Sequence, residues 1–184
     1  MNRMTRSGLL LFIAVIAASS AVHGADIRYK QSGDWFDVES VTGTNGWLSP
    51  GLPGMADTAR FNWGGNTVTL AGVAPTVNRV QLGVDESGTL VVNSGGHLTT
   101  LEDVDVGHND NDGTDTGTLI VNDGGRVDVG RILWTAHLPG SPTGNISINT
   151  GGVVEVASHL WWGVSGTSTV DISGTLMQTG GILG

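Results

Sequence analysis

Hydrophobic and polar residues alternate along several short stretches of the chain. Leu90 and Val92 are apolar with one residue between them, and the same spacing recurs at three later places, Leu119/Val121, Ile146/Ile148 and Val170/Ile172. The neighbouring positions are mostly Thr, Ser, Asn or Asp. Because successive side chains of a β-strand point to opposite faces, this alternation predicts short strands with one buried face.

Two further sets of alternating residues accompany these stretches. One set is Val80/Leu82, Val104/Val106, Ile132/Trp134 and Leu160/Trp162, and the other is Leu98/Thr100, Val127/Val129 and Val154/Val156. Together they form units of three short strands. Gly-Gly pairs punctuate the units and begin at residues 95, 124 and 151, which are steps of 29 and 27 residues. An imperfect earlier unit runs from Ala59 to Leu70.

A unit of this length corresponds to one turn of a right-handed parallel β-helix, in which each coil buries its apolar face against the next. The sequence therefore predicts an all-β protein, a right-handed parallel β-helix (β-solenoid) of about four to five coils over residues 58–184. Val92, Val121 and Ile148 would then form one column inside a shared core. An antiparallel sandwich or propeller is the alternative, which the close similarity of the units disfavours.

The segments at both ends depart from the units. Residues 25–57 carry Trp35, Phe36 and Trp47 in an irregular stretch, which we expect to act as an N-terminal cap on the solenoid. The sequence stops at Gly184 in mid-pattern. Two explanations are open: a truncated reading frame, or an end that stacks on a partner, including end-to-end self-association.

Glycine and asparagine recur at the turns. We expect the second Gly of each pair to adopt a positive φ, which turns the chain without steric cost. Asn93, Asn122 and Asn149 precede the pairs at equivalent positions. They predict a ladder of stacked side-chain amides, with simple tolerance of left-handed turn geometry as the alternative.

Residues 1–24 have the features of a Sec-type signal peptide. Arg3 and Arg6 precede the apolar run of residues 9–18, and Val22 and Gly24 stand before a cleavage point at Ala25. The protein is therefore expected to be secreted or held at the cell surface. An uncleaved membrane anchor is the alternative.

Composition narrows the function classes. The absence of Cys excludes disulfides, thiolate metal sites and a cysteine nucleophile. The formal net charge of −9 disfavours nucleic acid and anionic lipid as partners, because both repel an acidic surface. The 30 Gly, without a collagen period, fit many short strands joined by tight turns.

The residues 33–36 (Gly-Asp-Trp-Phe), Asp57 to Asn62 and the Gly-Thr-Leu-[Ile/Val]-Val-Asn-x-Gly-Gly units resemble bacterial secreted β-helix repeat proteins. That group is associated with PEP-CTERM sorting tails and is similar in style to autotransporter passengers. The resemblance implies an extracellular or cell-surface location and a structural or adhesive role, and it carries no catalytic residues. The Pro-Glu-Pro sorting motif of the group does not occur in this sequence.

Parallel β-helices of the pectin-lyase-like kind also include polysaccharide lyases and hydrolases. Asp128 and Glu155 occupy equivalent positions of successive units and are expected about 4.8 Å apart, as the paired carboxylates of a hydrolase could be. Arg126 shares their outward face. A solvated surface is the plainer explanation, and we predict that the protein is not an enzyme and needs no cofactor.

An acidic insertion before residue 116 suggests a Ca²⁺ site, the one exception to the prediction that the protein needs no cofactor. Residues 108–113, with Asp110, Asp112 and Gly113, partly follow an Asp-x-Asp-x-Asp-Gly loop. Carboxylates are suitable ligands for Ca²⁺, so Asp110, Asp112 and Asp115 are the candidate ligands. His108 replaces the first Asp, and Leu119 replaces the bidentate Glu. A polar loop without metal is the alternative.

The tryptophans divide by strand face. Alternation predicts Trp134 and Trp162 inside the core, and Trp161 outside beside Leu133. Trp161, Leu133, Asp128 and Glu155 are thus the candidate binding residues. The histidines, His97, His108, His137 and His159, fall at unrelated points of the units, so no metal cluster is expected among them.

These observations favour an extracellular or cell-surface structural or adhesive protein that acts as a stiff interaction scaffold. Its expected partners are cell-surface or matrix polymers, including polysaccharide, and not nucleic acid. The alternative is a carbohydrate-binding module or a fragment of a β-helical polysaccharide lyase or hydrolase.

Overall fold

The protein is described here by a computed structural model, which places residues 24–37, 46–48, 51–62, 64–108, 114–138 and 140–181. These residues form an all-β structure of parallel sheets without a helix, so none of them lies in a helix able to cross a membrane. The predicted signal peptide falls outside the described residues except for Gly24.

Three parallel sheets make up the structure. We call them the β8, β9 and β10 sheets, after three consecutive strands that each lie in a different sheet. The β8 sheet contains, in spatial order, β1 (Asp26–Arg28), β3 (Thr58–Phe61), β5 (Arg79–Leu82), β8 (Val104–His108), β11 (Ile132–His137) and β14 (His159–Trp161). The β9 sheet contains β2 (Gly33–Asp34), β4 (Asn66–Leu70), β6 (Gly88–Val92), β9 (Thr116–Val121), β12 (Thr143–Ile148) and β15 (Thr167–Ile172). The β10 sheet contains β7 (His97–Thr100), β10 (Arg126–Val129), β13 (Val153–Val156) and β16 (Thr175–Gln178).

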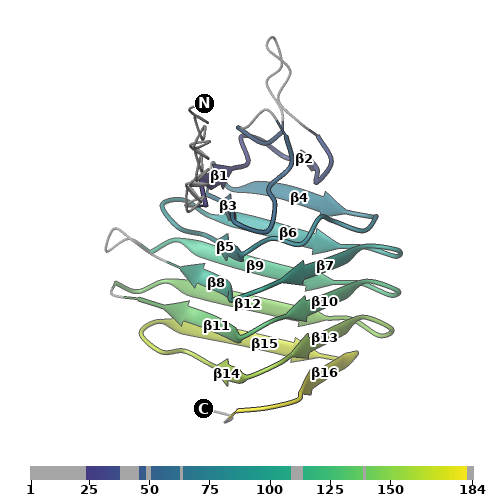
Figure 1. The fold of residues 1–184 in the computed structure, drawn as a ribbon. Coiled ribbons are helices and arrows are strands. Elements are labelled where there is room, and N and C mark those ends of the chain that lie inside the picture. The colour runs from purple at the N-terminus through teal and green to yellow at the C-terminus, as the bar shows by residue number, and fades with distance from the viewer. Residues whose placement is uncertain are drawn as a thin grey trace, which may run out of the picture.

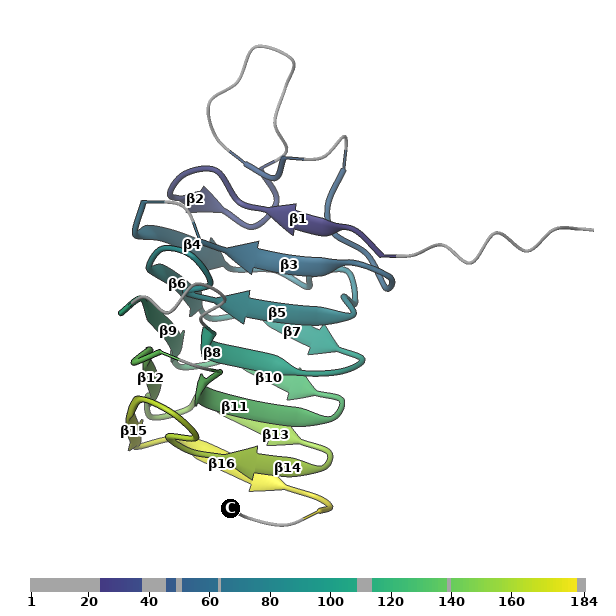
Figure 2. The ribbon, with the colours of Figure 1, turned by 90° about the vertical axis from the view of Figure 1, so that its left-hand side faces the viewer.

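From β5 onward, consecutive strands enter the three sheets in a fixed rotation, and we call each set of three a rung. The strands of each sheet lie one above another (Figure 1), and the β8 sheet is seen face-on in the turned view (Figure 2). The register is regular: β9 pairs with β6 at an offset of 29 residues and with β12 at an offset that places Ile148 beside Val121. The rungs therefore coincide with the units punctuated by Gly-Gly.

The core consists of columns of aliphatic side chains that run across the rungs. Val92 is the lateral neighbour of Val121, and Val121 of Ile148, and all three are buried. The column continues to Leu70 above and Ile172 below. The predicted column is confirmed. Each such side chain contributes roughly 1.5–3 kcal/mol when it leaves water, so the rungs are stabilised mainly by their neighbours.

The two glycines of each pair have different roles from those predicted. The first glycine takes the positive φ, at 78° in Gly95, 69° in Gly124 and 81° in Gly151, so the prediction for the second one was wrong. The second is required because it touches the rung before it. A Cβ on Gly96 would lie 2.3 Å from the carbonyl oxygen of Leu70, and one on Gly125 would lie 2.5 Å from that of Val92.

The asparagine ladder is confirmed. Asn122 Nδ2 donates to Asn93 Oδ1 at 2.7 Å, and Asn149 Nδ2 donates to Asn122 Oδ1 at 2.6 Å. The ladder runs beside the turns between the β9 and β10 sheets and links three successive rungs.

An aromatic cluster covers the N-terminal end of the core. Trp35 and Trp47 are buried, their ring centroids are 4.9 Å apart, and both pack against Phe61. Trp47 Nε1 also donates to the carbonyl oxygen of Trp35 at 2.7 Å. The segment is more regular than predicted, because β1 and β2 within it pair with β3 and β4.

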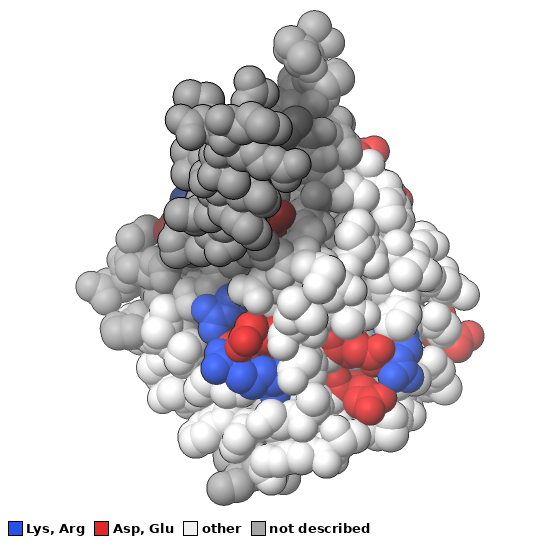
Figure 3. Space-filling model, in the orientation of Figure 1, with Lys and Arg blue, Asp and Glu red and all other residues white. Residues whose placement is uncertain are grey.

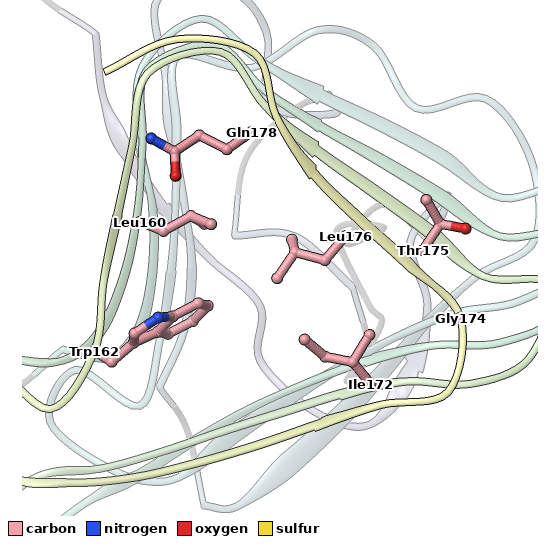
Figure 4. Close-up of a pocket in the computed structure, with 7 residues that line it drawn as sticks. All are labelled: Leu160, Trp162, Ile172, Gly174, Thr175, Leu176 and Gln178. Carbon is pink, nitrogen blue, oxygen red and sulfur yellow. The ribbon is translucent and has the colours of Figure 1, made fainter. Parts of the chain in front are cut away.

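At the opposite end, apolar side chains surround an open hollow of about 590 Å³. Leu160, Trp162, Leu176 and Ile172 point into it from the three walls (Figure 4). Ile172 is 46% exposed, whereas its column neighbour Ile148 is buried. The inward orientation predicted for Trp162 is confirmed, since it packs against the core.

Candidate functional site

Three side chains with metal-ligating atoms converge on the face of the β8 sheet that points away from the core. Asp105 and His108 lie on β8, and His137 ends β11, where it pairs directly with His108. One ligand atom from each residue lies within 4.8 Å of those of the other two. The prediction that the histidines fall at unrelated points was therefore wrong for this pair, which is separated by the same 29 residues as the glycine pairs at 95 and 124.

Asp105 is enclosed, although it faces away from the core. Its side chain has no exposed surface, and its Oδ2 lies 3.3 Å from Arg79 Nε and accepts a hydrogen bond from Gln81 Nε2 at 3.4 Å. Burial raises the pKa of Asp105 to about 7 against the lowering effect of Arg79, and the charge of Asp103 adds to the rise. The other carboxylate oxygen, Oδ1, is buried without a hydrogen-bond partner.

His137 is half-buried between polar and aromatic neighbours. Its ring stacks on Trp134 with centroids 4.2 Å apart and planes 19° from parallel. Burial lowers the pKa of His137 and the positive charge of Arg79 lowers it further, against the raising effect of Asp103, so the neutral imidazole is favoured. Its Nδ1 atom is buried without a hydrogen-bond partner. The residues flanking it, Ala136 and Leu138, adopt positive φ values of 48° and 83°.

Asp103 joins two arginines beside this group. It forms a close ion pair with Arg79, and it accepts bonds from Arg131 Nε at 2.9 Å and Nη2 at 2.7 Å. The side chain of Asp103 is almost fully buried. Burial alone would raise its pKa, but the hydrogen bonds from Arg131 and Arg79 outweigh burial and lower it. The ionised carboxylate therefore fixes the guanidinium groups of two rungs.

An aromatic row continues from His137 along the same face. Trp134 aligns with Trp161 one rung on, their rings stack with centroids 5.5 Å apart, and Trp161 is 38% exposed. Leu133 instead pairs with Val104 and is fully buried, so the predicted outward pair of Trp161 with Leu133 was wrong, as was the inward orientation of Trp134. Residues 132–134 are all apolar, and alternation alone does not choose between their faces.

Asp128 and Glu155 are direct lateral neighbours on the β10 sheet, as predicted. Arg126 bonds both, through Nη2 at 2.8 Å to Asp128 and 2.6 Å to Glu155, and His97 Nε2 lies 2.7 Å from Asp128. They border a shallow pocket of about 290 Å³. Figure 3 shows two separate clusters of acidic and basic side chains on this face of the molecule. The arrangement is an ion-pair network across three rungs.

The predicted Ca²⁺ site is described only in part. Asp110 and Asp112 lie outside the described residues. Asp115 is half-buried, and burial together with the charges of Asp85 and Glu86 raises its pKa. Asp85 and Glu86 belong to the preceding rung, so acidic residues of two rungs influence one another here.

Comparison with known proteins adds no identity: no protein-family model, curated protein or solved structure matches this chain.

Proposed function

We propose that the chain is a right-handed parallel β-helix that works as a stiff, exported interaction scaffold, with structural or adhesive contacts to a surface or matrix polymer. The register of the three sheets supports this fold, because every rung repeats the same three strands over the same columns. The repeat length and the Asn ladder support it as well.

The main support for this function is the composition of the outer face of the β9 sheet. One row across its strands is nearly uniform: Thr67, Thr89, Thr118, Asn145 and Thr169 are lateral neighbours in that order. The parallel row contains Thr69, Val91, Ile120, Ser147 and Asp171. Within these two rows Asp171 is the charged residue, in a chain with 17 Asp+Glu and 8 Lys+Arg.

Such a face suits a particular class of partner. Hydroxyl and amide groups repeat along it at the strand spacing of about 4.8 Å, and each presents donors and acceptors without a charge. A long neutral polymer or a hydroxyl-rich surface can contact many equivalent positions at once, so weak contacts add up through multivalency. Rigidity of the stack keeps the ordering cost of each contact low.

A second candidate function rests on Trp161. Its exposed ring, stacked on Trp134, offers a flat apolar platform at the edge of the described β8 sheet. Aromatic faces of this kind bind the apolar faces of sugar rings, and a carbohydrate-binding module would use the β8 sheet in place of the β9 sheet.

Pull-down of the protein by a panel of insoluble polysaccharides separates these functions. Thr118→Lys and Asn145→Lys place charge on the β9 face, Met177→Lys places it on an exposed site of β16, and Trp161→Ala removes the platform. The scaffold proposal expects binding that is lost in the first two variants and retained in the others. Loss in Trp161→Ala alone favours the carbohydrate-binding module, and depolymerisation abolished by Asp128→Ala would overturn both in favour of an enzyme.

A further inference from the structure

We propose that Asp105, His108 and His137 bind one divalent transition-metal ion of the zinc class on the outer face of the β8 sheet. The scaffold function does not require such a site, so this inference stands independently of it. The three residues come from two adjacent rungs, and their ligand atoms already lie within 4.8 Å of one another.

Unsatisfied buried atoms point to a missing ligand. Asp105 is fully buried, yet its Oδ1 has no hydrogen-bond partner, and the buried Nδ1 of His137 has none either. Buried polar atoms without partners are costly, and a cation bound by Asp105 and His137 would supply a partner to the cluster. Ala136 and Leu138, on either side of His137, adopt positive φ values, a strained backbone conformation that clusters at functional sites.

Gln81 has the position of a residue that orients a metal-bound histidine. Its Nε2 lies 3.0 Å from His108 Nε2, while its own buried Oε1 has no hydrogen-bond partner. Rotation of the amide by half a turn would let Oε1 accept a hydrogen bond from His108 Nε2–H, in exchange for the 3.4 Å bond that Gln81 Nε2 donates to Asp105. That proton fixes the tautomer whose Nδ1, 3.6 Å from Asp105 Oδ2, is the ligand atom.

The surrounding charges permit a dication. Arg79 Nε lies 3.3 Å from Asp105 Oδ2, and Asp103 binds Arg79 and Arg131 together. Glu102 also pairs with Arg131, so three carboxylates stand against two guanidinium groups around the site.

The donor set selects the class of ion. Two imidazoles and a carboxylate suit Zn²⁺, Fe²⁺, Co²⁺, Ni²⁺ or Cu²⁺, whereas Ca²⁺ and Mg²⁺ prefer oxygen ligands alone. Three protein ligands would leave a coordination position for water or for a group on a partner. The Trp134 ring stacks on His137 and so lies beside the cluster.

Calorimetric titration with ZnCl2 tests the site on the purified protein, produced without a polyhistidine tag and treated with a chelator. We expect one saturable Zn²⁺ site per chain, weakened at least about 100-fold in His137→Ala and about 10-fold in Gln81→Leu, since loss of an orienting residue alone costs 10- to 100-fold. Co²⁺ in place of Zn²⁺ should give a visible absorption band that is missing in His137→Ala.

His159→Ala is the matched control, because His159 lies on β14 of the same sheet, outside the cluster. Binding should be unchanged in this variant. Circular dichroism spectra that match the wild type establish that the variants fold. Asp105→Asn should also abolish binding, and should this variant of a buried residue fail to fold, His137→Ala tests the site in its place. Absence of saturable Zn²⁺ binding, retention of full affinity in His137→Ala, or equal weakening by His159→Ala would each overturn the proposal.

Discussion

Asn122 donates its side-chain amide to Asn93 Oδ1 over 2.7 Å, although 29 residues separate the two along the chain. Asn122 also accepts a bond from Asn149, so it is the middle member of the ladder. The ladder gives each Gly-Gly turn a fixed position above the previous one. The register of the β9 and β10 sheets is thus held from outside the core as well as from within.

Asn122→Ala should destabilise the protein more than Asn149→Ala. The first change breaks two ladder bonds and the second breaks one, at a net cost of about 0.5–1.5 kcal/mol for each bond. Urea unfolding measures the difference. Asn145→Ala, on the outer face of β12, is the control and should be close to neutral. Equal stability of Asn122→Ala and Asn145→Ala would show that the ladder contributes nothing.

The two glycines of one turn should respond differently to asparagine. Gly95 has a φ of 78°, and a Cβ there would make only an ordinary contact with the carbonyl oxygen of Ala71 at 3.5 Å. Asn tolerates that conformation, so Gly95→Asn should cost about 1 kcal/mol or less. At Gly96 any Cβ meets the carbonyl oxygen of Leu70, so Gly96→Asn should prevent normal stacking of this rung. Thermal unfolding of both variants measures this, and a similar loss at the two positions would contradict the assignment of roles.

Asp103→Asn should be more destabilising than Arg131→Gln. The neutral amide leaves Arg79 and Arg131 without their shared, buried counter-charge. We expect a loss of about 3 kcal/mol, the lower end of the range for broken buried pairs. The side chain of Arg131 is 51% exposed, so its removal should cost about 1 kcal/mol. Chemical denaturation gives both values. A larger loss for Arg131→Gln would mean that Asp103 is not the centre of this group.

Ca²⁺ should leave the melting temperature unchanged if the acidic segment before β9 is a plain polar loop. Asp115→Asn should then be neutral or slightly stabilising, within about 0.5 kcal/mol, because it relieves the repulsion from Asp85 and Glu86. Differential scanning fluorimetry with and without millimolar Ca²⁺ compares the two proteins. A rise in melting temperature that the Asp115→Asn variant lacks would instead support the Ca²⁺ site predicted from the sequence.

Much of the architecture follows from the sequence because two periodicities coincide. Alternation identifies the core face of each strand, and the Gly-Gly steps give the offset that stacks Val121 on Val92. Leu133 shows where alternation stops being sufficient. Its neighbours Ile132 and Trp134 are also apolar, and the correct face follows only when the offset of 29 from Val104 is applied.

Predicting the cluster of Asp105, His108 and His137 from the sequence requires the same offset, and also the burial of Asp105, which no sequence pattern contains. Counting 29 residues from His108 reaches His137, so their pairing was open to prediction. The burial of Asp105 was not, because its position alternates with core residues and an outward carboxylate is normally solvated. Its enclosure depends on the side chains around it, including those of Arg79 and Gln81, which come from another rung.

The central claim is that successive rungs stack in register along one axis, and pairs of spin labels measure that stacking most directly. The chain has no native cysteine, so labels can be attached to cysteines at Thr118, Thr89 or Thr67, each paired with one at Thr169. These three pairs span two, three and four strand spacings in the β9 sheet. The expected separations grow by about 4.8 Å per rung, from about 10 Å to about 19 Å, while the sequence separation doubles. A Thr67–Thr169 distance no longer than the Thr118–Thr169 distance, or one without a regular increment, would contradict the stacked arrangement.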